Sequence, residues 1–157
     1  MNIFKKQEKQ RRIQEHYKSA EEYMKGAQHY IKRKNYDKAE ASFLNAVEIY
    51  KQQISVEENE NIRVCLVDTY GKLALMFDEN RNIDKAKKYY SKAMGIMEEC
   101  VSENKLEYVS GLVAGLNCLG VLIESENCFR KAYTYAKLLP EDAVCKDVIE
   151  TWGDVFK

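Results

Sequence analysis

The chain repeats itself at a fixed interval, and this repeat constrains the fold more than any other feature. The segment Asn35–Ile49 (NYDKAEASFLNAVEI) matches Asn82–Ile96 (NIDKAKKYYSKAMGI) at an interval of 47 residues (82 − 35 = 47). The preceding segments align at the same interval in three pairs: Tyr23 with Tyr70, Ala27 with Ala74, and Tyr30 with Phe77. Repeats of roughly 20–50 residues are typical of folds in which one supersecondary unit stacks on the next.

A third copy follows, and it matches less well. The segment Cys128–Ala132 aligns with Asn82–Ala86 at an interval of 46 residues (128 − 82 = 46), and Gly120 then corresponds to Ala74. In this alignment Ala136 and Leu139 replace Tyr90 and Ala93, so large and small residues exchange places. We therefore expect the third repeat to pack differently from the first two.

The composition favours helices throughout. There is one proline, Pro140, and there are seven glycines, so few helix breakers interrupt the pattern. Asn35, Asn82 and the pair Ser55 with Glu58 suit N-caps, the last as a capping box. The predicted helices cover about Phe4 or Arg12 to Arg33, Asp37–Ile54, Glu58–Glu79, Asp84–Ser102, Leu106–Glu124, Cys128–Leu139 and, opened by Pro140, Glu141–Phe156.

The order of small and aromatic residues resembles the tetratricopeptide helix–turn–helix family. Small residues suit the points where two helices cross closely, and aromatic residues fill the gaps beside them. Ala27, Ala39 and Ala46 would allow the close crossing, while Tyr23 and Phe43 would fill. The interval exceeds the usual 34 residues of the family, so we expect longer helices. The resemblance implies an all-α, right-handed solenoid in one domain, 1–157, with repeats at about 12–54, 58–102 and 106–139 and a capping helix at 140–156.

The resemblance also implies a binding groove lined by the first helix of each pair. Two residue series would face it, one of Met24, Gly71 and Asn117, the other of Gln28, Leu75 and Val121. Some family members hold the carboxylate tail of heat-shock chaperones with lysine and asparagine at these places, and this chain lacks those cations. An alternative is that Met24, Leu75 and Val121 belong to the core, because longer helices can bury more of the inner face.

Charge and cysteine content restrict the partners. Lys plus Arg and Asp plus Glu both number 25, which argues against a large nucleic-acid surface. The basic run of Lys5, Lys6, Lys9, Arg11 and Arg12 is interpreted as a solvated helix face rather than a nucleic-acid or membrane site. No apolar run approaches the roughly 20 residues of a membrane span, and the N-terminus lacks a secretory pattern. The five cysteines have no C-x-x-C spacing, so we expect a cytoplasmic protein without a metal site.

No catalytic motif accompanies the repeat. His16 and His29 have no partner at metal-binding spacing, and phosphate-binding and nucleophile-elbow patterns are missing. We therefore expect a non-enzymatic module without a cofactor that binds a protein or peptide, such as an adaptor or small chaperone. The alternatives are a fragment of a peptide-sensing regulator and a scaffold that binds copies of itself.

Overall fold

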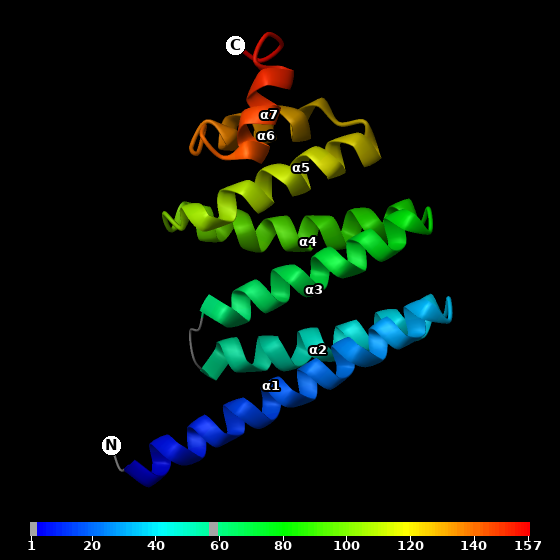
Figure 1. Cartoon of the computed structure of the whole chain (residues 1–157), viewed down its shortest axis with the longest axis vertical. Coiled ribbons are helices and arrows are strands. Elements are labelled where there is room, and N and C mark those ends of the chain that lie inside the picture. Colours follow the sequence, from blue (N-terminus) through cyan, green and yellow to red (C-terminus); the bar gives the residue numbers. More distant parts are fainter. Residues whose placement is uncertain (1–2, 57–59) are drawn as a thin grey trace. The chain divides into compact units, whose positions relative to one another are not determined.

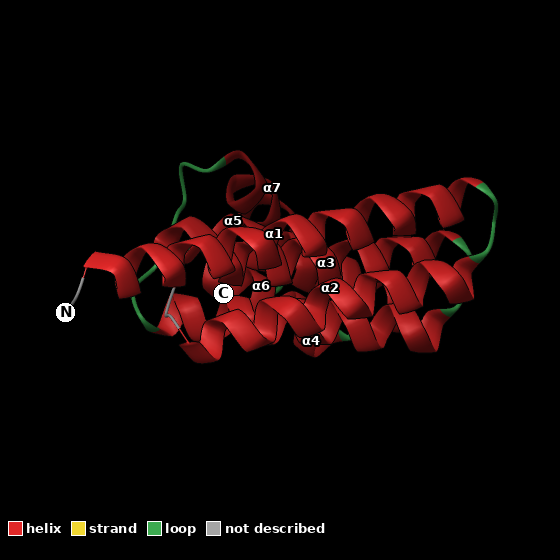
Figure 2. Ribbon diagram, turned by 90° about the horizontal axis from the view of Figure 1, so that it is seen from below, coloured by secondary structure: helices red, strands yellow, loops and turns green. Residues whose placement is uncertain are grey.

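The computed structural model describes residues 3–56 and 60–157, and the regular structure in these ranges is entirely helical (Figure 2). Seven α-helices pack in chain order as antiparallel pairs, which confirms the all-α prediction for the described residues. The contacts group into two compact units, residues 1–76 and 77–157. Each unit is described by itself below.

Unit 1 contains α1 (Ile3–Lys32), α2 (Tyr36–Val56) and α3 (Glu60–Glu79), of which the last three residues belong to unit 2. The helices α1 and α2 lie side by side as an antiparallel pair (Figure 1). Ala27, Ala39 and Ala46 are fully buried, as is Phe43, so the predicted close crossing is confirmed. Tyr23 was expected to fill the core, but 41 % of it is exposed. The predicted capping box of Ser55 with Glu58 lies outside the residues whose side chains are described.

The turns after α1 and α3 have the same geometry. Lys34 and Arg81 adopt left-handed φ values of 56° and 57°. The N–H groups of Asn35 and Asn82 donate to the carbonyl oxygens of Tyr30 (2.9 Å) and Phe77 (2.8 Å). Their side-chain oxygens accept from the backbone N–H groups three residues on, at 3.2 Å in both turns, so both predicted N-caps are confirmed. The two segments that match in sequence at an interval of 47 residues thus also share the structure of their turns.

Unit 2 contains the end of α3, α4 (Ile83–Ser102), a short 3₁₀ helix η1 (Leu106–Tyr108), α5 (Val109–Ile123), α6 (Glu126–Ala136) and α7 (Ala143–Trp152). The four α-helices from α4 to α7 pack each against the next in chain order, and α7 also contacts α5. In Figure 1 they run from green to red.

The turn between α5 and α6 shows that the predicted alignment of the third segment is wrong. Glu124 takes the left-handed position with φ of 53°. Ser125 N–H donates to Gly120 O at 2.9 Å, and Ser125 Oγ accepts from Cys128 N–H. Ser125 therefore stands for Asn82, at an interval of 43 residues (125 − 82 = 43), and the alignment of Cys128 with Asn82 is wrong by three residues. The reason is that a serine replaces asparagine as the N-cap, so the matching Lys-Ala letters lie one turn further along the helix.

The corrected register pairs Tyr133 with Tyr90 and Ala136 with Ala93, and all four are buried. Large and small residues do exchange places in the third segment, but not at Ala136 and Leu139 as predicted. Gly120 stands for Phe77, and Phe129 stands for Ala86. A Cβ atom on Gly120 would lie 2.7 Å from Phe129 Cε1, so the phenylalanine ring of α6 occupies the space that the glycine of α5 leaves.

The last helix starts later and ends earlier than predicted. Asp142 is its N-cap, with Oδ1 accepting from the N–H groups of Val144 (3.0 Å) and Cys145 (3.2 Å), so Pro140 does not open the helix. The expected apolar stripe is only partly buried. Val148 and Phe156 are buried, whereas Val155, which lies beyond the end of α7, is 62 % exposed, and Val144 is also exposed.

One stretch of unit 2, Leu106–Ile123, is long and apolar enough to cross a membrane by length and composition alone. The expectation that no apolar run approaches this length is therefore corrected. Here α5 packs against α4, α6 and α7, and Leu112, Val113 and Leu116 are buried. A helix with packed neighbours on several sides can have the same length and composition.

Candidate functional site

Four of the predicted groove residues belong to unit 1 and lie on two helices that contact each other. Met24 and Gln28 are one turn apart on α1, and Gly71 and Leu75 are one turn apart on α3. Thr69 Oγ1 of α3 lies 3.6 Å from Met24 Sδ, so the two helices meet beside these positions. The structure thus brings the unit 1 members of the predicted series onto adjacent helices.

These four residues are accessible to different degrees. Leu75 is 52 % exposed, Gln28 is also exposed, and Met24 is half-buried. A Cβ atom built on Gly71 would meet no atom within 4 Å, so the space in front of α3 at this point is open among the described residues. Leu75 is therefore not part of a core, in contrast to the alternative considered from the sequence.

The remaining two predicted residues, Asn117 and Val121, lie on α5 in unit 2. Asn117 is half-buried, and Val121 is 67 % exposed and so outside any core. The register set by the third turn assigns the places of Gly71 and Leu75 to Ala114 and Cys118, each three residues before the predicted residue. Asn117 and Val121 are therefore not the equivalents of Gly71 and Leu75, because the predicted alignment of the third segment was wrong by three residues.

Val121 borders a hollow of about 470 Å³ in unit 2. Three aromatic rings follow one another beside it: Phe129 stacks on Trp152 with centroids 4.6 Å apart, and Trp152 stacks on Phe156 at 5.5 Å. Arg130 lies over the Phe156 ring at 4.7 Å. These contacts join α6 to α7 and its C-terminal extension, and the lining residues are Gly120, Val121, Glu124, Glu126, Phe129, Trp152, Val155 and Phe156.

Three of the five thiols, those of Cys65, Cys118 and Cys145, are poorly suited to nucleophilic chemistry. None of the five cysteines, all of which lie in the described part of the chain, forms a disulfide bond. Burial is the main cause that raises the pKa of Cys65 and of Cys118, and it raises the pKa of Cys145 to about 11. Because the thiolate is the reactive form, these three side chains remain protonated thiols near neutral pH. Among residues 3–56 and 60–157, no group of three His, Cys, Asp or Glu side chains could hold a metal ion.

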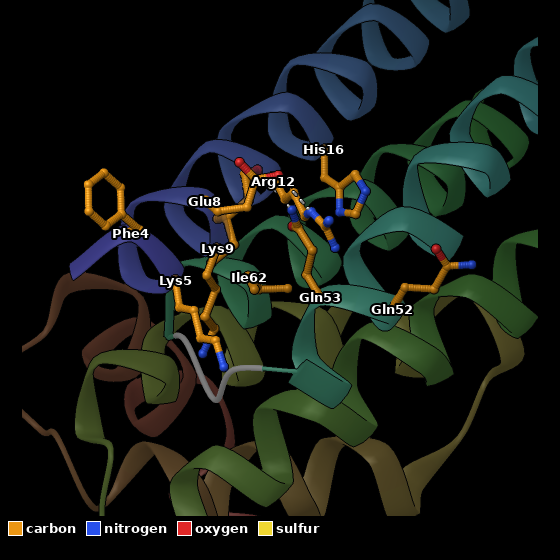
Figure 3. A pocket seen from close by; sticks show the side chains of 10 residues that line it. Phe4, Lys5, Glu8, Lys9, Arg12, His16, Gln52, Gln53 and Ile62 are labelled. Carbon is orange, nitrogen blue, oxygen red and sulfur yellow. Dashed lines mark hydrogen bonds and ion pairs between the residues drawn. The ribbon is translucent and has the colours of Figure 1, made fainter. Parts of the chain in front are cut away.

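A larger hollow, of about 710 Å³, lies in unit 1 where α1 begins (Figure 3). The 30 residues of α1 exceed the 21 of its partner α2, and the first turns of α1 extend past the end of α2 (Figures 1 and 2). Residues from α1, the end of α2 and the start of α3 surround the space thus left. The described lining residues are Phe4, Lys5, Glu8, Lys9, Arg12, Ile13, His16, Gln52, Gln53 and Ile62.

Gln53 carries an unusual polar group at this hollow. The residue is only 4 % exposed, and its Nε2 donates to the carbonyl oxygen of Ile13 at 3.1 Å, which ties α2 to α1. Its Oε1 is buried and accepts no hydrogen bond from the described residues. Leaving a buried acceptor unpaired costs about 1–3 kcal/mol, so this oxygen is a place where a ligand donor would be favourable.

The cationic side chains at and near the hollow differ in whether they form ion pairs. Glu8 Oε1 accepts from Arg11 (3.1 Å) and Arg12 (3.2 Å), and the hydrogen bond from Arg11 is the largest cause that lowers the pKa of Glu8. Lys5 and Lys9 have no ion-pair partner in the described part of the chain. Figure 3 shows both lysines extending from α1 in the same direction.

Only some of the residues that line this hollow could be singled out from the sequence. The basic run was visible, and we interpreted it as a solvated face. Gln53 could not be singled out, because it lies in a polar stretch of α2 and its burial depends on the packing of α1. Ile62 gave no signal of its own either, since it begins a helix with a mixed apolar pattern.

Comparison of the chain with protein-family models gives no match, and neither curated proteins nor solved structures give one.

Proposed function

We propose that this chain is a non-catalytic module that binds a protein or peptide, acting in the cytoplasm as an adaptor or small chaperone. In this proposal the helix pairs form a right-handed solenoid of the tetratricopeptide type. The identical turns after α1 and α3 support a true structural repeat. The raised pKa values of Cys65 and Cys118 are consistent with a non-catalytic role.

The observation that carries the proposal is the exposed apolar face of α3. Leu75 is 52 % exposed, and one turn before it Gly71 has no atom within 4 Å of the place of a Cβ. The other side of the same helix packs normally, with Leu73, Ala74 and Met76 buried. An apolar side chain beside an open backbone is suited to contact a partner's chain, because the missing side chain lets another backbone approach closely.

The neighbouring side chains on α1 extend this face. Met24 is flexible and polarizable, which suits contact with varied apolar groups. Gln28 is exposed and offers both a donor and an acceptor to a peptide backbone. Apolar contact with a few polar groups is the usual composition of a peptide-binding surface.

The test uses Gly71→Gln, which fills the open space on α3, and Gly95→Gln as the matched control. Gly95 is an exposed glycine of α4 that also has nothing within 4 Å of its Cβ place. Proteins retained by the wild-type chain from the source cell are identified by mass spectrometry, and their affinity for both variants is measured. We expect Gly71→Gln to weaken binding at least about tenfold, which is 1.4 kcal/mol, and Gly95→Gln to leave it unchanged. Equal affinity for both variants would refute the use of this face.

The two alternatives predict other results. A self-assembling scaffold would show a concentration-dependent mass in light scattering, and Gly71→Gln would abolish it if this face were the contact. A regulatory fragment would bind a short free peptide with the same dependence on Gly71 and would retain no folded protein.

A further inference from the structure

The hollow at the start of α1 combines three properties that together point to a ligand. Its rim is basic, because Lys5, Lys9 and Arg12 line it together with Glu8, which is the one carboxylate among the described lining residues. Its walls include apolar side chains from α1 and α3, and its α2 side holds a buried oxygen that lacks a donor.

The lysines near the start of α1 do not stabilise this helix. The first turn of α1 contains no acidic residue, although the partial positive charge of a helix N-terminus favours acids there and disfavours lysine. Lys5 and Lys9 are one turn apart and exposed on the same face. They remain available to an anionic ligand, whereas Arg11 and Arg12 already contact Glu8.

The walls and the buried oxygen decide which anion suits the site. Ile13 is half-buried and Phe4 is 77 % exposed, so a ligand gains by covering these two side chains with apolar groups, whereas Ile62 is already almost fully buried. Gln53 Oε1 needs an N–H or O–H donor. The phosphate groups of a nucleic acid only accept, and its donors are confined to the bases and, in RNA, to the 2′-OH group, whereas a peptide supplies an N–H at nearly every residue. A peptide with carboxylates and apolar side chains therefore satisfies all three properties.

We propose that this hollow binds a short acidic segment of a partner protein. Carboxylates of the segment pair with Lys5 and Lys9, an apolar side chain contacts Ile13 and Phe4, and a backbone N–H donates to Gln53 Oε1. The volume of about 710 Å³ limits the occupant to a few residues, and it is in the range of about 300–1,000 Å³ common for ligand-binding hollows. This site is separate from the α1–α3 face around Leu75, so each proposal can fail without the other.

The test measures binding of fluorescent heptapeptides to the full chain by anisotropy. The probe is a pool in which glutamate alternates with an equal mixture of Leu, Ile, Phe and Val, and the reference pool has glutamine in place of glutamate. We expect saturable binding of the acidic pool below about 1 mM, at least about tenfold tighter than that of the glutamine pool, and weaker when the salt is raised about fourfold.

Two substitutions on α1 provide the matched comparison. Lys9→Glu reverses a charge at the hollow, and Lys25→Glu reverses the charge of an exposed lysine on the same helix outside it. We expect Lys9→Glu to weaken binding of the acidic pool about tenfold, because an attraction is replaced by a repulsion. Lys25→Glu should change it less than about twofold, since screening removes most distant effects.

A third substitution, Gln53→Leu, tests the buried acceptor. It should weaken the acidic pool about fivefold, by loss of one hydrogen bond, and leave the salt dependence unchanged. Because Gln53 also bonds to Ile13, the folded fraction is checked by circular dichroism, and the Lys9→Glu comparison stands if this variant unfolds.

Several results would overturn the proposal. They are no saturable binding of the acidic pool at about 1 mM, equal binding of both pools, and equal loss with Lys9→Glu and Lys25→Glu. Oligothymidine or phosphatidylserine vesicles that bind more tightly than the acidic pool, with the same sensitivity to Lys9→Glu, would instead show a polyanion site. Gly71→Gln should leave the acidic pool unaffected, which separates this site from the face around Leu75.

Discussion

The contact between Gly120 and Phe129 gives the sharpest test of the corrected third repeat. Replacing Gly120 by alanine adds one methyl group to the buried side of α5. That carbon would lie 2.7 Å from Phe129 Cε1, 2.8 Å from Cδ1 and 3.0 Å from Cζ, all closer than an ordinary contact. The ring cannot move away freely, because it stacks on Trp152 with centroids 4.6 Å apart.

Two opposing effects set the magnitude. Alanine in place of glycine inside a helix stabilises by about 0.5–1 kcal/mol, because the unfolded chain loses less freedom. Overpacking a well-packed site costs about 1–3 kcal/mol. Since the clash is with three atoms of one aromatic ring, we expect the steric cost to prevail and Gly120→Ala to destabilise by about 0.5–2 kcal/mol.

Urea denaturation followed by circular dichroism measures this difference. Gly71→Ala is the matched control, since its Cβ meets no atom within 4 Å, and it should stabilise by about 0.5–1 kcal/mol. The double variant Gly120→Ala with Phe129→Ala should show a favourable coupling of about 0.5–3 kcal/mol relative to the single changes. If Gly120→Ala stabilised as much as Gly71→Ala, the ring would not occupy the glycine's space and the corrected register would be refuted.

Three further predictions follow from the same structure. Ala39→Leu and Ala86→Leu should each destabilise by about 1–3 kcal/mol in denaturant melts, because both alanines are fully buried where helices cross; midpoints like those of the wild type would contradict the close crossing. Asp142 accepts from the start of α7, and the N–H of Cys145 is the main cause that lowers its pKa, so its contribution to stability should be lost as the pH falls below about 4; thermal melts of Asp142→Asn should show a smaller acid loss. Deleting Glu141–Lys157 should expose the rings of α6 and promote aggregation, and a truncated chain of unchanged solubility and stability would show that α7 does not cover them.

Much of the local structure was predictable from the sequence because it depends on neighbouring residues. The helical class follows from the scarcity of glycine and proline. Asn35 and Asn82 could be assigned as N-caps because a short amide before a helix satisfies a free N–H three residues on. The buried alanines were found because their places recur at a constant interval.

The register of the third repeat could not be obtained from matching letters. Lys131 and Ala132 resemble Lys85 and Ala86, but the start of α6 depends on a left-handed residue and on the hydroxyl of Ser125. The displaced register then moved the candidate positions on α5 from Ala114 and Cys118 to Asn117 and Val121. The letters match in a different register from the helices because, in the register of the structure, Gly120 stands for Phe77 and Phe129 stands for Ala86.

What the sequence by itself determined is therefore the helical class, the first two turns and the small residues at the close crossings, all of which follow from interactions within a few residues or from an undisturbed repeat. Only the tertiary structure decided which apolar residues remain exposed, as for Leu75 and Val121, and which polar ones become buried, as for Gln53. The physical reason is that exposure depends on what lies opposite a side chain. The hollow at the start of α1 exists because α1 is longer than its partner α2, and the residues it brings together come from three helices that only packing makes neighbours.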